Sequence, residues 1–204
     1  MKRQNGSGRG FTLIELLVVI AIIGLLSAII VPSINGAMKS AKRARALKQM
    51  TELDGAIKRF FTEYGRMPMP QNKTYADYID KDDLACTPEE ATQIVQILIN
   101  FDDWPVKQNT RQIVFLELDP ASFKNPIDGK PCKTEAEMKT ALLANGYQDP
   151  WGNPYGILLD ETLDDKIIVS PYGTPENPVR AKVGIYSWGE TGDTGALSPP
   201  YKTW

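Results

Sequence analysis

An uninterrupted apolar stretch near the N-terminus is the strongest feature of the hydrophobic pattern. Residues 11–31 carry one charged side chain, Glu15, and follow a polar, basic segment of ten residues. As a helix the stretch would extend about 31 Å at ~1.5 Å per residue, which matches a hydrocarbon core of roughly 30 Å. It is longer than the apolar region of a secretory signal, about 7 to 15 residues, and residues 29–32 offer no small-residue cleavage site. The pattern therefore predicts a transmembrane anchor over residues 11–31.

Apolar residues continue at steps of mostly three or four beyond the anchor, with Lys and Arg between them. They are Met38, Ala41, Leu47, Met50, Leu53, Ile57, Phe60, Phe61 and Tyr64. Pro32 and Gly36 interrupt this pattern, and in a helix interior proline costs ~3 kcal/mol and glycine ~1 kcal/mol. We expect one long helix from about Phe11 to Tyr64, kinked or loosened at residues 32–36. Its amphipathic continuation covers residues 32–66.

Residues 67–204 combine short helical and strand patterns, which predicts one globular α+β domain. Two capping signals, at residues 87–90 and 134–137, each precede apolar residues at helical spacing, and Asn145-Gly146 ends the second helix. Strands are predicted from runs rich in β-branched and aromatic residues at 112–118, 155–160, 166–170 and 183–187. The predicted fold is a long N-terminal helix packed on a small antiparallel sheet, with extra short helices.

Composition excludes most catalytic chemistry. The 204 residues contain no histidine, so His-activated nucleophiles, His general bases and His-ligated metals are excluded. Paired acids occur at 82–83, 89–90, 102–103 and 164–165. Neighbouring side chains point in different directions on helices and strands, so we interpret these pairs as solvated charges rather than catalytic carboxylates. The sequence predicts a protein that is not an enzyme.

Two cysteines, Cys86 and Cys132, each lie just ahead of a predicted helix start. They are compatible with one disulfide in an oxidising compartment and also with two free thiols. A bridge would tie the two helix starts together.

Basic residues flank the apolar stretch on both sides. Lys2, Arg3 and Arg9 precede it. Those that follow it are Lys39, Lys42, Arg43, Arg45 and Lys48. Counting Lys and Arg alone would place the C-terminal side in the cytoplasm. The second cluster could bind lipid head groups or DNA, but a solvated helix face explains it with fewer assumptions, and the formal net charge of -2 gives no reason to expect a nucleic-acid partner.

One motif at the start of the apolar stretch resembles a known family. Arg9-Gly10-Phe11-Thr12-Leu13-Ile14-Glu15-Leu16 resembles the cleavage and methylation signature of type IV prepilins and type II secretion pseudopilins. The resemblance implies that residues 1–10 form a leader, that a prepilin peptidase cleaves between Gly10 and Phe11, and that Phe11 is N-methylated. It also implies an assembly role for Glu15, an N-terminus on the cytoplasmic side, and residues 67–204 in the periplasm.

The same resemblance implies partners and a destination for the chain. The partners are the peptidase, identical and related pilin subunits in a filament, and an inner-membrane assembly platform. The subunit would be a single-pass inner-membrane protein that enters a filament on assembly. Ala21, Gly24 and Ala28 on one helical face allow close helix approach, a pattern that plain anchors also show.

Two C-terminal segments resemble the major pseudopilin of type II secretion. Residues 149–156, Asp-Pro-Trp-Gly-Asn-Pro-Tyr-Gly, resemble the motif before its sheet, and we interpret them as a turn with inward-packed aromatics rather than a ligand platform. Residues 186–195 resemble its calcium loop, with Glu190 and Asp193 as candidate ligands. The paired acids expected later are replaced by Ser198-Pro199-Pro200, so we predict no cofactor and keep calcium as the alternative.

The sequence predicts a structural filament subunit of a type II secretion-like system. Two alternatives stay open. One is a type IV pilin that serves adhesion, motility or DNA uptake. The other is a monomeric periplasmic binding domain on a plain membrane anchor.

Overall fold

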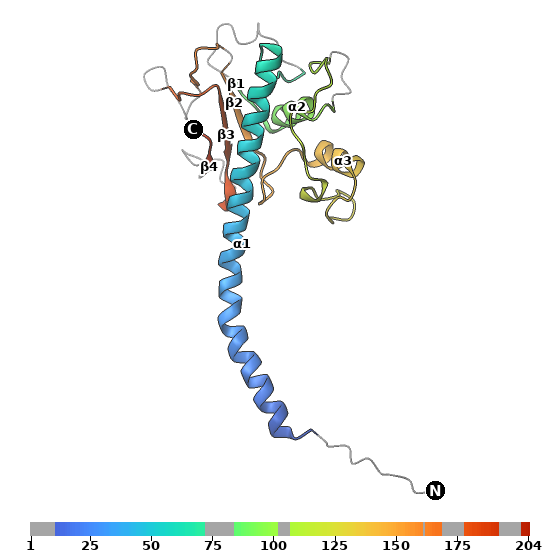
Figure 1. The fold of residues 1–204 in the computed structure, drawn as a ribbon, viewed down its shortest axis with the longest axis vertical. Coiled ribbons are helices and arrows are strands. Elements are labelled where there is room, and N and C mark those ends of the chain that lie inside the picture. The colour runs from blue at the N-terminus through green and yellow to red at the C-terminus, as the bar shows by residue number, and fades with distance from the viewer. Residues whose placement is uncertain (1–10, 72–83, 102–106, 161, 169–177, 192–200) are drawn as a thin grey trace, which may run out of the picture. The chain divides into compact units, whose positions relative to one another are not determined.

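The computed structural model describes residues 11–71, 84–101, 107–160, 162–168, 178–191 and 201–204, without the side chains of residues 29–33 and 84–85. The chain divides into two compact units, residues 1–41 and residues 42–204. Helix α1, Leu13–Tyr64, contributes to both units (Figure 1).

The predicted long helix is confirmed. Helical backbone continues through Pro32 and Gly36, so the helix is not broken there. It ends at Gly65, which adopts a φ of 68° and donates its N–H to the Phe61 carbonyl at 2.8 Å. Glycine reaches this left-handed conformation without the steric cost that a Cβ brings. Within the part of the chain that the structure describes, no helix has both the length and the apolar character needed to cross a membrane.

Among the described residues, the sheet has four antiparallel strands in sequence order: β1 (Leu84–Ala85), β2 (Gly156–Leu159), β3 (Val183–Ser187) and β4 (Tyr201–Lys202). In the central pair, Ile157 lies opposite Ile185 and Leu158 opposite Gly184. Because side chains alternate between faces, Ile157 and Ile185 enter the main core, while Leu158 packs on the other face with Ile167 and Val179. The predicted α+β fold is confirmed.

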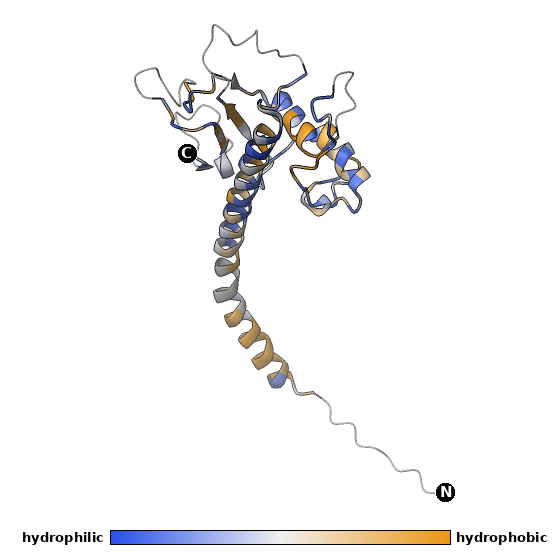
Figure 2. Cartoon of the chain, turned by 45° about the horizontal axis from the view of Figure 1, so that its top comes forward, coloured by the Kyte–Doolittle hydropathy of each residue, from blue (hydrophilic) through white to orange (hydrophobic). Residues whose placement is uncertain are grey.

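The main core lies between α1, the sheet and helix α2 (Pro88–Leu98). Figure 2 shows α2 as a strongly hydrophobic segment of the globular part. The side chains of α1 in the second unit that are at most 1% exposed are Ala46, Met50, Leu53, Ala56, Ile57 and Phe60. The predicted apolar residues from Met50 to Phe60 therefore face the core, whereas Met38 and Leu47, predicted on the same face, are exposed.

Both short helices begin at the predicted caps. Thr87 accepts the Glu90 N–H, and the Glu90 carboxylate accepts the Thr87 N–H at 2.8 Å, which completes a capping box. Helix α3 (Glu135–Asn145) begins at Thr134 and ends at Gly146, whose φ is 73°. Two single 3-10 turns, η2 (Pro120–Ser122) and η3 (Gly189–Thr191), complete the described elements.

The strand predicted at residues 112–118 is wrong. The segment forms no strand and has no partner strand among the described residues, and Gln112 at its start has a φ of 56°. Phe115 and Leu116 instead donate their N–H groups to the Leu98 carbonyl at the end of α2. The fully buried Asn109 amide donates to the Ile113 carbonyl and accepts the Ile113 N–H. The apolar run packs against helix ends, and its pattern therefore does not reflect a sheet.

The other strand predictions differ in outcome. Those at 155–160 and 183–187 are confirmed as β2 and β3. Within 166–168 only Ile167 forms a bridge, with Val179, and residues 169–170 lie outside the described residues. Sequence reasoning missed β1 and β4, which contain two residues each.

The disulfide considered between Cys86 and Cys132 is not formed. Cys132 is a free, buried thiol. The two residues belong to different clusters: Cys86 packs against the main core, whereas Cys132 packs with Met138 and Ala141 of α3. Burial raises the pKa of the Cys132 thiol, with smaller contributions from Glu137 and Asp128.

Two tyrosines in the core make stability sensitive to alkaline pH. Tyr147 and Tyr155 are buried with ring centroids 5.2 Å apart, and burial raises both phenol pKa values above the usual range. Above the ordinary tyrosine pKa of ~10, the unfolded chain releases protons that the native state retains, so the free energy of unfolding falls as pH rises.

We therefore expect Tyr147→Phe to flatten this fall, because it removes one ionisable phenol. Urea unfolding of wild type and variant from about pH 8 to 11 measures the two slopes. Equal slopes would contradict the assignment to Tyr147.

Candidate functional site

The start of α1 is a capping box. The Thr12 N–H and hydroxyl both donate to Glu15 Oε2, at 2.8 and 2.7 Å, and the Glu15 N–H donates to Thr12 Oγ1 at 3.2 Å. Thr12 is thus the N-cap and Glu15 the third helical residue. Sequence reasoning missed this role, although the Thr-x-x-Glu spacing used for α2 and α3 is also present here.

The surface around Glu15 is apolar and uncovered. Phe11 and Leu13 are 78% and 86% exposed. A shallow hollow of about 400 Å³ lies against Phe11, Ile14, Glu15 and Val18. The helix therefore presents one carboxylate within an apolar surface, and this arrangement can accept a cation together with an apolar partner surface.

The small residues of the first unit are also uncovered. Ala21 and Ala28 are exposed, and a Cβ added at Gly24 would meet no atom within 4 Å. Of the two residues at the predicted cleavage site, the structure describes Phe11, whereas Gly10 lies outside the described residues.

The turn at residues 149–153 is built on one carboxylate. Asp149 Oδ1 accepts the N–H groups of Trp151 and Asn153 at 2.9 Å, and Oδ2 accepts the Ser187 hydroxyl at 2.6 Å. The Asn153 amide donates to the Gly189 carbonyl at 2.6 Å. All of these groups are used within the chain, so they lock the turn to the end of β3.

The aromatic residues of this turn are also engaged. Tyr155 is buried and donates its hydroxyl to Gln49 Oε1 of α1 at 2.8 Å. Trp151 stacks on Tyr201 of β4, with ring centroids 5.5 Å apart and an interplanar angle of 9°. The contacts agree with the interpretation as a packed turn.

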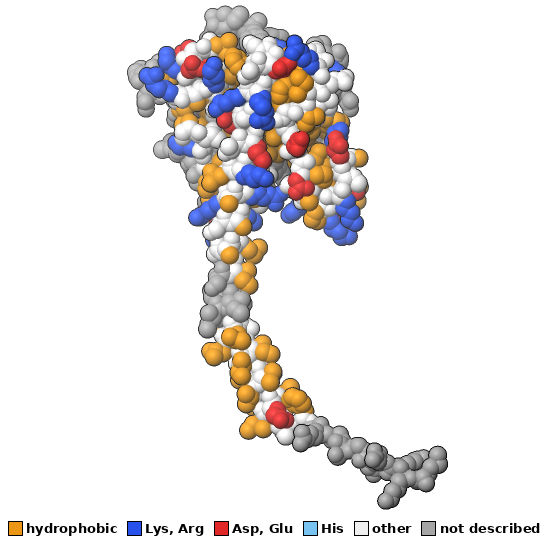
Figure 3. Space-filling model, viewed as in Figure 1, with side chains coloured by type: hydrophobic (Ala, Val, Ile, Leu, Met, Phe, Trp, Pro, Cys, Tyr) orange, Lys and Arg blue, Asp and Glu red, His pale blue; other side chains and the backbone are white. Residues whose placement is uncertain are grey.

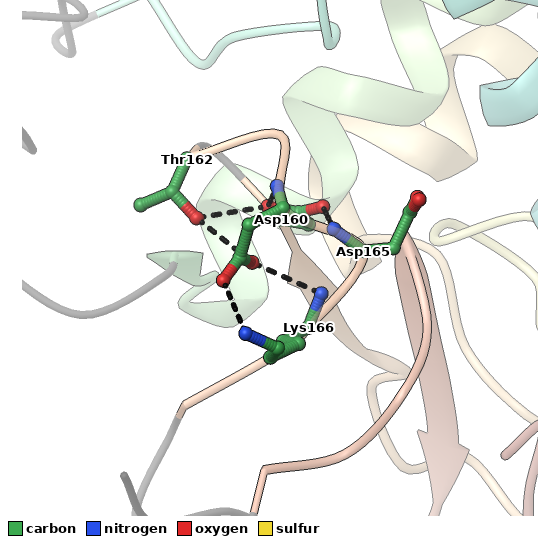
Figure 4. A network of polar contacts seen from close by, with 5 residues as sticks. Asp160, Thr162, Asp165 and Lys166 are labelled. Carbon is green, nitrogen blue, oxygen red and sulfur yellow. Dashed lines mark hydrogen bonds and ion pairs between the residues drawn. The ribbon is translucent and has the colours of Figure 1, made fainter.

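The acid pair at 164–165 belongs to a second turn (Figure 4). The buried Asp160 carboxylate accepts the N–H groups of Asp164 and Asp165. Asp164 pairs with Lys166, and Asp165 pairs with Lys182, both at 3.2 Å. Glu89 and Glu90 lie in the first turn of α2, and the pairs at 82–83 and 102–103 lie outside the described residues.

The calcium alternative falls partly outside the described residues. Glu190 lies in η3, and Asp193 belongs to the undescribed residues 192–200. Across the described ranges, no three His, Cys, Asp or Glu side chains gather as a metal site would require.

Residues 7–31 match the family described as the prokaryotic N-terminal methylation motif. The predicted resemblance to prepilins and pseudopilins is confirmed. The chain is 37% identical over 68 residues to the type II secretion system core protein G of Klebsiella pneumoniae, which covers 33% of this chain and 46% of that protein. It is 42% identical over 66 residues to the type IV major pilin protein PilA of Myxococcus xanthus, which covers 32% of this chain and 30% of that protein.

These similarities have a defined extent. The chain spans less than half the length of the curated relatives described here. No solved structure matches the chain. The prepilin-type N-terminus contains Phe11 and Glu15, whereas the match to the methylation motif ends before the globular domain.

Proposed function

We propose that this chain is a structural subunit of a pseudopilus or pilus filament in a type II secretion-like system. The single observation that carries the proposal is the prepilin-type N-terminus over residues 7–31, with Glu15 in an uncovered apolar surface at the start of α1. When neighbouring helices or lipid cover the apolar surface that the isolated subunit exposes, the free energy of the system falls.

The proposal includes processing, location and partners. A prepilin peptidase removes residues 1–10, and residues 11–31 hold the subunit in the inner membrane with the globular domain in the periplasm. An assembly platform then transfers the subunit to a filament of identical and related pilins. The relatives are named as a secretion core protein and a pilin, and we propose no catalysis for this chain.

A type IV pilin is the second candidate. The similarity to the pilin PilA and to the fimbrial protein EcpC of Eikenella corrodens supports this candidate. The similarity to core protein G supports the secretion role in the same way. A plain anchor with a monomeric domain differs from both candidates, because it would need neither cleavage nor assembly.

Processing gives the first test. The mature protein is expected to begin at Phe11 and to carry an N-methyl group, because Gly10-Phe11 matches the prepilin cleavage site. Intact mass spectrometry of the membrane-extracted protein measures both changes. Gly10→Leu is the matched variant and is expected to keep residues 1–10. A wild-type protein that still begins at Met1 in cells with active peptidase would refute the proposal.

A further inference from the structure

A hairpin presents the large apolar side chain of Ile127 to solvent. Lys124 and Pro131 form an antiparallel bridge, and Cys132 donates its N–H to the Phe123 carbonyl at 2.9 Å. At the tip of the hairpin, Ile127 is 90% exposed. This exposure is greater than that of any other large apolar residue in the described chain.

The tip is held by its own hydrogen bonds. Asn125 Oδ1 accepts the Ile127 N–H at 2.9 Å, and the Asn125 carbonyl accepts the Gly129 N–H at 2.9 Å. Asp128 Oδ1 accepts the Lys130 N–H at 3.1 Å, and Gly129 adopts a φ of 69°. A side chain on such a turn keeps its position before binding, so little entropy is lost when a partner covers it.

The hairpin is also basic. Residues 123–133 contain Lys124, Lys130 and Lys133 but only one acid, Asp128. Figure 3 shows Lys and Arg side chains gathered at the lower end of the globular part, where Figure 1 places the chain around residues 120–130. The surface is therefore an apolar knob with a positive rim.

A complementary hollow lies elsewhere on the same domain. A hollow of about 310 Å³ is lined by Val114, Phe115 and Leu116, with Glu52 and Glu117 among its polar residues. Val114 is 55% exposed at this site. The Arg59 guanidinium, which also lines the hollow, is held by the Phe115 carbonyl at 2.6 Å. The hollow offers Val114 as its exposed apolar side chain, together with two carboxylates and the single Arg59 guanidinium.

The knob and the hollow lie at different levels of α1. Arg45 donates to the Ser122 carbonyl just before the hairpin, and Arg59 donates to Phe115 in the hollow. These two arginines are about 21 Å apart along the helix axis at ~1.5 Å per residue. One copy can therefore place its knob in the hollow of another while its own hollow stays open. Such heterologous contacts produce open helical assemblies when the rotation between copies does not close a ring.

We propose that Ile127 of one subunit occupies the hollow beside Val114 of the next copy of this chain in the filament. The contact is head to tail, and the positive rim of the hairpin faces Glu52 and Glu117. The inference rests on the proposed function, because it names one contact between the globular domains of assembled subunits.

Cysteine cross-linking tests the contact. Ile127→Cys combined with Val114→Cys is expected to give a ladder of dimers, trimers and higher species when sheared filaments are oxidised and run without reductant. Leu143→Cys with Val114→Cys is the matched control, because Leu143 is an equally apolar surface residue, 61% exposed, on α3. Wild type, with its native Cys86 and Cys132, is the background.

A second variant removes the knob without touching the core. Ile127→Asp is expected to lower filament yield about tenfold, because it puts a charge where the proposed contact between subunits would bury an apolar side chain. Leu143→Asp is expected to leave the yield within about twofold of wild type. Mature subunit in the membrane fraction is measured in parallel for both variants.

The outcomes separate this contact from the proposed function. Filaments that give no ladder, a ladder of equal extent from the Leu143 control, or normal yield from Ile127→Asp would each overturn the contact and leave the filament role intact. Cross-links only to other proteins would overturn the assignment to a second copy. Absence of wild-type filaments, despite mature Phe11 and the assembly machinery, would overturn the proposed function itself.

Discussion

Glu15→Val is expected to insert and to be cleaved at Gly10, yet to yield at least tenfold fewer filaments than wild type. The proposed cleavage would give Phe11 a terminal amine, whose ordinary pKa is ~7.7 and which would stay charged when methylated. In a filament, Glu15 of one subunit can neutralise this amine on its neighbour. Loss of one partner of a buried ion pair leaves an uncompensated charge and costs ~3 to 5 kcal/mol.

Glu15→Gln separates charge from helix capping. Glutamine at the third helical position can still accept from the Thr12 N–H, so it keeps the capping box but loses the charge. We expect Glu15→Gln to assemble as poorly as Glu15→Val. Shearing followed by immunoblotting measures filament yield against mature subunit in the membrane fraction. Normal yield from Glu15→Gln would restrict Glu15 to capping its own helix.

Gly156→Ala is expected to destabilise the globular domain by about 3 kcal/mol, at the upper end of typical overpacking effects. Gly156 lies opposite Tyr186 in the sheet, and a Cβ there would overlap the Tyr186 ring. The ring cannot move freely, because it contacts Trp188 and Trp204 edge to face, at centroid distances of 5.7 and 6.4 Å. The methyl group must therefore displace packed aromatic side chains.

A double-mutant cycle checks this cause. Tyr186→Ala removes the ring, so Gly156→Ala should cost much less in that background. Urea unfolding of the four proteins measures the coupling between the two positions. If Gly156→Ala costs the same with and without the Tyr186 ring, steric overlap is not the reason.

The parts of the fold that depend on local signals were predictable. Helix caps at Thr87 and Thr134 and the glycine at position 65 act through neighbouring backbone groups, so their residue types identify the helix ends. Residues 112–118 show the opposite case. Their apolar pattern reports burial, but burial against the end of α2 gives the same pattern as burial in a sheet. Only the hydrogen bonds from Phe115 and Leu116 to the Leu98 carbonyl, seen in the structure, distinguish the two cases. The two-residue strands β1 and β4 are too short to carry a period.

The candidate site was predictable to a similar degree. Phe11 and Glu15 were identified from the prepilin motif. The hydrogen bond from Thr12 to Glu15 follows from the Thr-x-x-Glu capping spacing, which overlaps that motif. The hollow beside Val114 could not be predicted, because its walls come from α1 and from a segment much later in the chain, with Arg59 and Phe115 separated by 56 residues.

The buried face of α1 also has a mechanical consequence. From Ala46 to Phe60, six side chains of one helix are enclosed by the core, over ~21 Å of helix axis. A pulling force along this helix acts on all six contacts in parallel, as shear, so they must yield together. A force applied across the helix would instead peel the contacts apart one after another. Tension transmitted through α1 therefore meets the globular domain in its most resistant direction.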